Sequence, residues 1–143
     1  MNRISALGLD IGQRRIGVAG CDGTGLIATG LTTLERTNFR HDLAQLKHWV
    51  DLRQAQILVV GLPYTMSGNL GYQAEKIQTI AERFSQSLEI PLEYIDERLT
   101  SIEAQEQLKM QKRFNARQDK GMIDKQAAAI ILQQWLDCKR TQG

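Results

Sequence analysis

The sequence contains few cysteines, which cross-link small folds, and few prolines, which interrupt helices and strands. It has only two cysteines and two prolines in 143 residues. Cys21 and Cys138 lie far apart and outside any paired ligand spacing, so they predict neither a disulfide framework nor a zinc site. Because there is also no low-complexity tract, an intrinsically disordered chain is excluded. We expect a single domain, residues 1–143.

Long hydrophobic runs are also missing. The longest uninterrupted apolar run, Ala127–Leu132, is much shorter than the roughly 20 residues needed to cross a bilayer. The N-terminus lacks the apolar core and cleavage site of a signal peptide. We therefore expect a cytoplasmic protein with no membrane contact. The net charge of +2 is too small to predict nucleic-acid binding by itself, so such a role depends on where the charges lie.

The first three apolar segments predict an antiparallel meander. Ile4–Ile11 and Ile16–Cys21 are separated by a short polar turn and predict a hairpin, and Leu26–Thr33 predicts a third strand. Asp10 is the one carboxylate in the first segment and lies near its end. Two interpretations remain open: Asp10 has a functional partner, or it caps the turn through backbone hydrogen bonds.

The middle of the chain predicts alternating helices and strands. Apolar periodicity predicts a helix over about Asn38–Arg53 and a second one from near Tyr72 to just before Glu89. The β-branched run Gln56–Pro63 predicts a buried parallel strand. Leu92–Asp96 predicts a fifth strand, parallel to it because right-handed crossovers dominate. The fold class is therefore α/β, with a mixed five-stranded sheet of three antiparallel strands followed by two parallel strands, flanked by helices.

Two more helices are predicted in the C-terminal third. Thr100–Glu103 has the spacing of a capping box that opens a helix, and apolar spacing predicts a last helix that opens at Asp124. The stretch between them, about Met110–Ile123, lacks a clear period and predicts a mobile loop or a frayed helix. From Lys109 to Lys125 the chain carries six cations against two carboxylates. This basic segment is where nucleic acid is expected to bind.

Carboxylates lie at or directly after the ends of two predicted strands. Another carboxylate lies at the start of the last predicted helix. Asp10, the pair Asp96 and Glu97, and Asp124 are expected at one edge of the sheet, beyond the carboxyl ends of the parallel strands. Clustered carboxylates without lysine partners are tolerated when divalent cations supply positive charge, and all-oxygen ligands select Mg²⁺ or Mn²⁺ over zinc. Such ions promote in-line phosphodiester hydrolysis. The alternative is that these are turn, ion-pair and helix-cap residues.

Four blocks of sequence together resemble a known family. They are Leu7–Gly12 with Arg15–Ala19, Val59–Pro63 with Gly68, Asp96–Thr100, and Asp124–Ala128 with Ile131–Gln133. In this order and spacing they resemble the YqgF family of pre-16S ribosomal RNA nucleases, also called Holliday-junction-resolvase-like proteins, within the ribonuclease H superfamily. The first block alone also resembles actin-like ATPases, but those proteins close two lobes around a nucleotide and this chain supplies one.

The resemblance implies a ribonuclease H-like fold and a metal-dependent nuclease, a hydrolase that acts on ester bonds. The implied catalytic and metal-binding residues are Asp10, Glu97 and Asp124, with Mg²⁺ or Mn²⁺ as the cofactor. Glu97 is preferred to Asp96 because its longer side chain reaches farther past the strand end. The implied substrate is precursor 16S ribosomal RNA first and branched DNA second, bound by a monomer or a homodimer. A Holliday junction resolvase and a non-catalytic RNA-binding module of ribosome assembly stay open as alternatives.

The candidate nucleic-acid-binding residues are basic side chains close to these carboxylates or in the basic segment. They are Arg14, Arg15, Arg98, Lys112, Arg113 and Arg117. Phosphate contacts supply most of the non-specific affinity for nucleic acid. The alternative for each is an ordinary solvated surface charge. Because phosphate contacts do not report base or sugar, these residues do not choose between RNA and a DNA junction.

Overall fold

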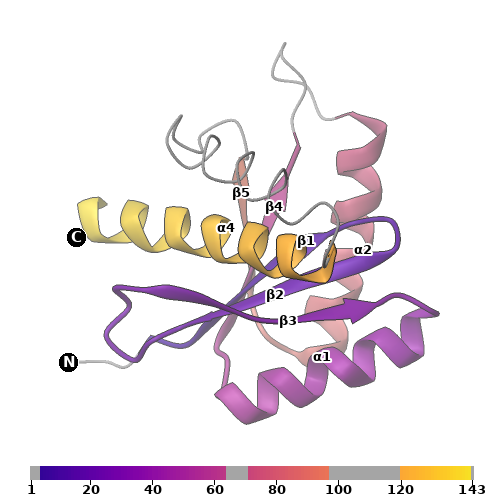
Figure 1. Ribbon diagram of the computed structural model, residues 1–143, viewed down its shortest axis with the longest axis horizontal. Coiled ribbons are helices and arrows are strands. Elements are labelled where there is room, and N and C mark those ends of the chain that lie inside the picture. The colour runs from indigo at the N-terminus through magenta and orange to yellow at the C-terminus, as the bar shows by residue number, and fades with distance from the viewer. Residues whose placement is uncertain (1–3, 64–70, 97–119, 143) are drawn as a thin grey trace.

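The computed structural model describes residues 4–63, 71–96 and 120–142. The strands are β1 (Ala6–Ile11), β2 (Arg15–Cys21), β3 (Ala28–Glu35), β4 (Ile57–Leu62) and β5 (Leu92–Asp96). The helices in these ranges are α1 (Phe39–Arg53), α2 (Tyr72–Leu88) and α4 (Lys120–Gln142) (Figure 1). The helix predicted from Thr100–Glu103 lies outside the described residues.

The strands form one mixed sheet of order β3-β2-β1-β4-β5. β1 pairs antiparallel with β2, and β2 pairs antiparallel with β3. On its other side β1 pairs in parallel with β4, which pairs in parallel with β5. The predicted architecture of three antiparallel strands followed by two parallel strands is therefore confirmed.

The third strand begins two residues later than predicted, at Ala28 instead of Leu26. The reason is the turn before it. The Asp22 carboxylate accepts hydrogen bonds from the backbone N–H groups of Leu26 and Ile27, at 2.9 and 3.2 Å. These two apolar residues are thereby held in the turn, and their side chains are exposed. Apolar character alone therefore placed the strand start too early.

Local hydrogen bonds and backbone conformation set the ends of α1 and α2. The Asn38 side chain accepts a hydrogen bond from the backbone N–H of His41 and caps the start of α1. Gln54 and Glu89 are the C-caps that follow α1 and α2, both in the left-handed conformation, with φ of 51° and 57°. Pro91 follows Glu89 closely and is incompatible with a longer helix. The predicted bounds of both helices are confirmed.

The start of the last helix was predicted wrongly. α4 begins at Lys120, so Asp124 lies inside the helix and is not its first residue. Residues 120–123 are helical although the basic segment shows no apolar period there. Aspartate is a common N-cap, which favoured Asp124 as the start. In the structure the Asp124 carboxylate instead accepts a hydrogen bond from Arg15 of β2.

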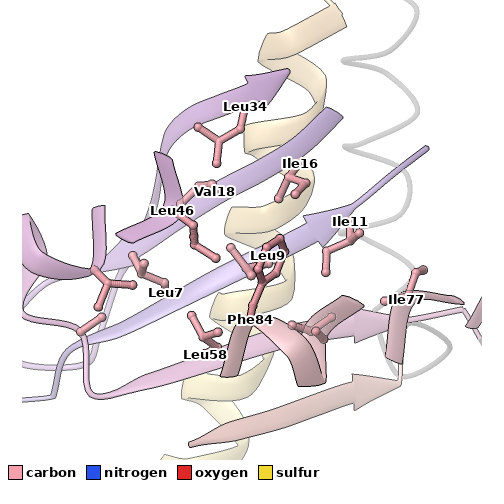
Figure 2. Close-up of a cluster of buried hydrophobic side chains, with 14 of the residues drawn as sticks. Leu7, Leu9, Ile11, Ile16, Val18, Leu34, Leu46, Leu58, Ile77 and Phe84 are labelled. Atoms are coloured by element: carbon pink, nitrogen blue, oxygen red, sulfur yellow. The ribbon is translucent and has the colours of Figure 1, made fainter. Parts of the chain in front are cut away.

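Helices cover both faces of the sheet. Leu7 and Leu9 of β1 lie on the face covered by α1 and α2, where they share a core with Leu46 and Phe84 (Figure 2). The opposite face is crossed by α4, and its core includes Ala6, Ala19, Ala128 and Leu132, among others (Figure 1). The central strands are therefore buried on both sides, as their nearly continuous apolar sequences indicate. Within the described ranges, no helix is long and apolar enough to span a membrane.

Candidate active site

The carboxyl ends of the three parallel strands meet at one edge of the sheet. The register places Leu9 of β1 beside Val60 of β4, and Leu62 of β4 beside Asp96 of β5. Asp10 follows Leu9 directly and is the second-last residue of β1. Asp10 and Asp96 therefore lie near the same edge, with β4 between their strands, as the sequence predicts.

The side chain of Asp10 lies on the α4 face of the sheet. Side chains alternate between the faces along a strand, and Leu9 and Ile11 belong to the core under α1 and α2. Asp10 stands between them and must therefore point the other way. Its direct partner on β2 is Gly17. Opposite residues of an antiparallel pair have their Cα atoms only about 4.5 to 5.5 Å apart and share one face.

Glycines on this face let α4 lie very close to the sheet. A Cβ atom added to Gly8 would be 2.7 Å from Cβ of Leu132 and 2.9 Å from the carbonyl oxygen of Ala128. One added to Gly17 would overlap the backbone carbonyl of Asp124. Since real interiors do not accept such overlaps, only glycine fits at Gly17. This packing places Asp124 directly over Gly17, the neighbour of Asp10.

Arg15 fixes the carboxylate of Asp124. Its Nε donates a hydrogen bond to Oδ2 of Asp124 at 2.6 Å, and the two side chains are 27% and 23% exposed. Arg15 lies two residues before Gly17 on β2, so it shares the face on which α4 packs. Asp124 therefore has a basic partner, in contrast to the carboxylates without lysine partners that were expected from the sequence. The predicted phosphate-binding role of Arg15 stays a prediction, because in this structure Arg15 binds a protein carboxylate.

Hydrogen bonds fix the conformation of the turn that follows Asp10. The backbone N–H of Gly12 donates to the carbonyl of Arg15 at 2.9 Å, and Nη1 of Arg36 donates to the carbonyl of Gly12 at 2.6 Å. The carbonyl of Arg14 accepts from the backbone N–H of Arg36 at 2.8 Å. Arg14 is exposed on this turn, close in sequence to Asp10, where a phosphate contact was predicted.

The other predicted site residues lie outside the described ranges. They are Glu97, Arg98, Lys112, Arg113 and Arg117. Within the described ranges, no three or more His, Cys, Asp or Glu side chains are grouped closely enough to hold a metal ion. Of the predicted triad, the structure brings the backbones of Asp10 and Asp124 close together, with Gly17 between them. Glu97 comes directly after the last residue of β5. The donor set is all carboxylate oxygen, which fits Mg²⁺ or Mn²⁺ and not zinc.

A cavity of about 560 Å³ adjoins this edge beside α2. Ile11, Gly12 and Gln13 line one side of it, and Tyr72 and Lys76 of α2 are among the residues on the other. Sequence reasoning did not find this cavity, because its residues form no motif. The sequence contains one feature that points to it: Tyr72 stands four positions before Lys76, so the two share one face of the predicted helix.

The sheet order, the carboxylate near the end of β1 and the aspartate of the C-terminal helix above it together define a ribonuclease H-like fold. A solved structure, Thermus thermophilus RuvC in complex with a Holliday junction substrate, superimposes with a TM-score of 0.63 over 96% of each chain. Only 12% of the aligned residues are identical, so this likeness supports the fold alone. The predicted fold class is confirmed.

The chain belongs to the RuvX family, described as Holliday junction resolvase, whose model matches residues 4–138. A relative from Rippkaea orientalis is 68% identical over 140 residues, which are 98% of this chain and 100% of the relative. One from Synechocystis sp. is 59% identical over 139 residues, 97% of this chain and 91% of the relative. Both carry the name "Putative pre-16S rRNA nuclease". The predicted family is confirmed, and so is the enzyme class, a nuclease that hydrolyses phosphodiester bonds.

Proposed function

We propose that this chain is a metal-dependent nuclease that processes pre-16S ribosomal RNA, with Asp10, Glu97 and Asp124 as its catalytic, metal-binding residues. The observation that carries the proposal is the contact of α4 with Gly17. In this contact the backbone of Asp124 lies against Gly17, which pairs with Asp10 near the end of β1. The backbones of Asp10 and Asp124, which are distant in the sequence, are neighbours there, and β5 ends with Asp96 at the same edge, directly before Glu97.

The protein contributes rigidity and orientation to this site. Asp10 lies on β1, which is hydrogen-bonded to a strand on each side, so its backbone is well fixed. Arg15 orients Asp124 through the 2.6 Å hydrogen bond, as the groups that support metal ligands commonly do. Mg²⁺ or Mn²⁺ bound by these carboxylates would supply the positive charge that offsets negative charge on the phosphodiester as it is hydrolysed.

RNA is the first choice of substrate because the relatives named above are called pre-16S rRNA nucleases and are up to 68% identical to this chain. Branched DNA is the second candidate, since the family model is described as Holliday junction resolvase. Arg14 on the exposed turn, Arg15, Arg98 and the cations of the basic segment are the proposed phosphate contacts. A monomer or a homodimer in the cytoplasm remains the expected working form.

The test incubates the protein with end-labelled precursor 16S RNA and with a synthetic four-way DNA junction, each in Mg²⁺, Mn²⁺ or EDTA. We expect metal-dependent cleavage of the RNA by the parent and none by Asp10→Asn. Asp51→Asn is the matched control, because Asp51 is an exposed aspartate on α1 that pairs only with its helix neighbour Lys47 among the contacts described. Cleavage by Asp10→Asn at the parent rate contradicts the proposal. Binding of RNA without cleavage favours the non-catalytic module, and cleavage of the junction alone favours a resolvase.

A further inference from the structure

The cavity beside α2 has the size and lining of a small-ligand site. Its volume of about 560 Å³ lies within the usual range for such sites, roughly 300 to 1,000 Å³. Ile11 and Ile77 contribute apolar surface and are themselves only 4% and 8% exposed. Polar and charged side chains, among them Gln13, complete the lining. The cavity therefore combines an apolar part with a polar one.

Among the lining residues that the structure describes, the charged groups are all positive. Arg36 and Lys76 line the cavity, and no acidic side chain is found among its lining residues in the described ranges. One N–H of Arg36 donates a hydrogen bond to the Gly12 carbonyl. A guanidinium has five N–H donors. This lining is suited to an anion.

An aromatic ring stands at the same cavity. Tyr72, at the start of α2, is 74% exposed, which is unusual for so large a side chain. Nζ of Lys76 lies over the Tyr72 ring, 4.4 Å from its centre, so a stacking base has to use the opposite face of the ring. An exposed ring next to a cation is the combination with which proteins bind single-stranded nucleic acid, since the base stacks on the ring and the phosphate meets the cation.

The cavity also adjoins the candidate catalytic residues. Ile11 and Gly12 line it and directly follow Asp10 along the chain. Ile11 faces α1 and α2 whereas Asp10 faces α4, so the cavity and the carboxylates lie on opposite sides of one strand end. A nucleic-acid strand that crosses the end of β1 therefore has the cavity on one side and the carboxylates on the other.

From these observations we propose that the cavity binds one unpaired nucleotide of the RNA substrate close to the cleavage site. Its base stacks on Tyr72, and its phosphate binds Lys76 and Arg36. The proposal rests on the proposed nuclease function and adds a requirement to it, that the substrate has a single-stranded segment beside the scissile bond. A fully paired RNA would leave this cavity empty.

The test measures binding by fluorescence anisotropy in EDTA, where cleavage is prevented. Two labelled RNA hairpins with the same stem are compared, one with a single-stranded extension and one blunt. Tyr72→Ala should weaken binding of the extended hairpin by about fivefold or more, the effect of losing one base–aromatic stack. Binding of the blunt hairpin should not change. Tyr72→Phe keeps the aromatic face and should bind both RNAs like the parent.

The cation is tested with a matched pair of variants. Lys76→Gln should weaken binding of the extended hairpin and lower the log–log salt slope by roughly 0.7, the effect of losing one phosphate contact on a single strand. Lys47→Gln removes the same charge from an exposed position on α1 outside the cavity and should leave the slope unchanged. Thermal unfolding checks that all variants are folded.

The outcomes separate this proposal from the proposed function. If the parent binds the extended hairpin and Tyr72→Ala binds it equally well, or weakens both hairpins equally, the nucleotide site is refuted while the nuclease function stands. If the parent binds neither hairpin, the nucleotide site is also refuted, whereas the proposed function fails only if precursor 16S RNA is not cleaved in the metal-dependent assay above.

Discussion

Replacing Gly17 with alanine tests how the site is assembled. The added Cβ would overlap the backbone carbonyl of Asp124. A backbone group inside a helix cannot rotate away as a side chain can, so α4 has to move as a unit. That movement would separate Asp124 from Asp10 and disturb the hydrogen bond from Arg15. We therefore expect a loss of both stability and cleavage.

The size of the effect follows from overpacking. Extra carbon atoms forced into a packed interior cost about 1 to 3 kcal/mol. Alanine gains back about 0.4 to 1 kcal/mol because it restricts the unfolded chain. We expect a net loss near the upper end, about 2 kcal/mol, because the obstacle is backbone. For a chain of this length this corresponds to a melting temperature lower by roughly 6 to 8 °C.

Gly20→Ala, on the same strand, is the matched control. Its Cβ would meet the side-chain ends of Leu31 and Arg53, at 2.9 and 3.2 Å, which can shift. It should melt within about 3 °C of the parent, since a cost below roughly 1 kcal/mol is expected where neighbours can yield. Melting curves and cleavage rates of the two variants are compared. If Gly17→Ala melts at the parent temperature and cleaves at the parent rate, the close packing of α4 does not assemble the site.

Three further predictions concern charge. The hydroxyl of Thr24 and the backbone N–H groups of the turn hold the pKa of Asp22 below its ordinary value of 3.8. The ionised carboxylate therefore adds stability above that pH, and this is lost as the pH falls through the lowered pKa. Asp22→Asn should show a shallower loss of stability below about pH 4, and parallel acid unfolding curves would contradict this. Neutralising Lys112, Arg113 and Arg117 together should lower the salt slope of RNA binding by roughly 0.7 to 0.9 per lost contact, whereas an unchanged slope would exclude the basic segment as a clamp. Ca²⁺ should bind but support little cleavage, because its looser coordination shell misplaces the reacting groups; equal rates in Ca²⁺ and Mg²⁺ would refute this.

The sheet was predictable because its strands carry simple signals. The apolar runs of β1 and β4 and the shorter β5 are bounded by Gly, Pro or charged residues, and right-handed crossovers leave few ways to connect them. The place of Asp10 at a strand end followed from the same pattern. The third strand was misplaced because the hydrogen bonds of Asp22 hold two apolar residues in a turn. Such local competition is hard to see in an apolar pattern.

The site was only partly predictable, because its assembly depends on contacts between distant segments. The sequence named Asp10 and Asp124 as partners, but the hydrogen bond from Arg15 to Asp124 joins residues 109 positions apart. The close approach of α4 depends on what a side chain at Gly17 would meet. The cavity that Tyr72 and Lys76 line is formed by residues of a turn and of a helix that are distant in the sequence. Spacing along the chain reports none of these contacts, since each depends on tertiary packing.

The most direct test of the proposed metal site measures Mn²⁺ binding without any substrate. Electron paramagnetic resonance follows free Mn²⁺ as it is titrated into the parent, Asp10→Asn, Asp124→Asn and the control Asp51→Asn. Each of the two site variants should lose at least about tenfold in affinity, because even residues that only support metal ligands contribute 10- to 100-fold. The control should bind like the parent. If Asp10→Asn and Asp124→Asn both bind Mn²⁺ as tightly as the parent, Asp10 and Asp124 do not share a metal site.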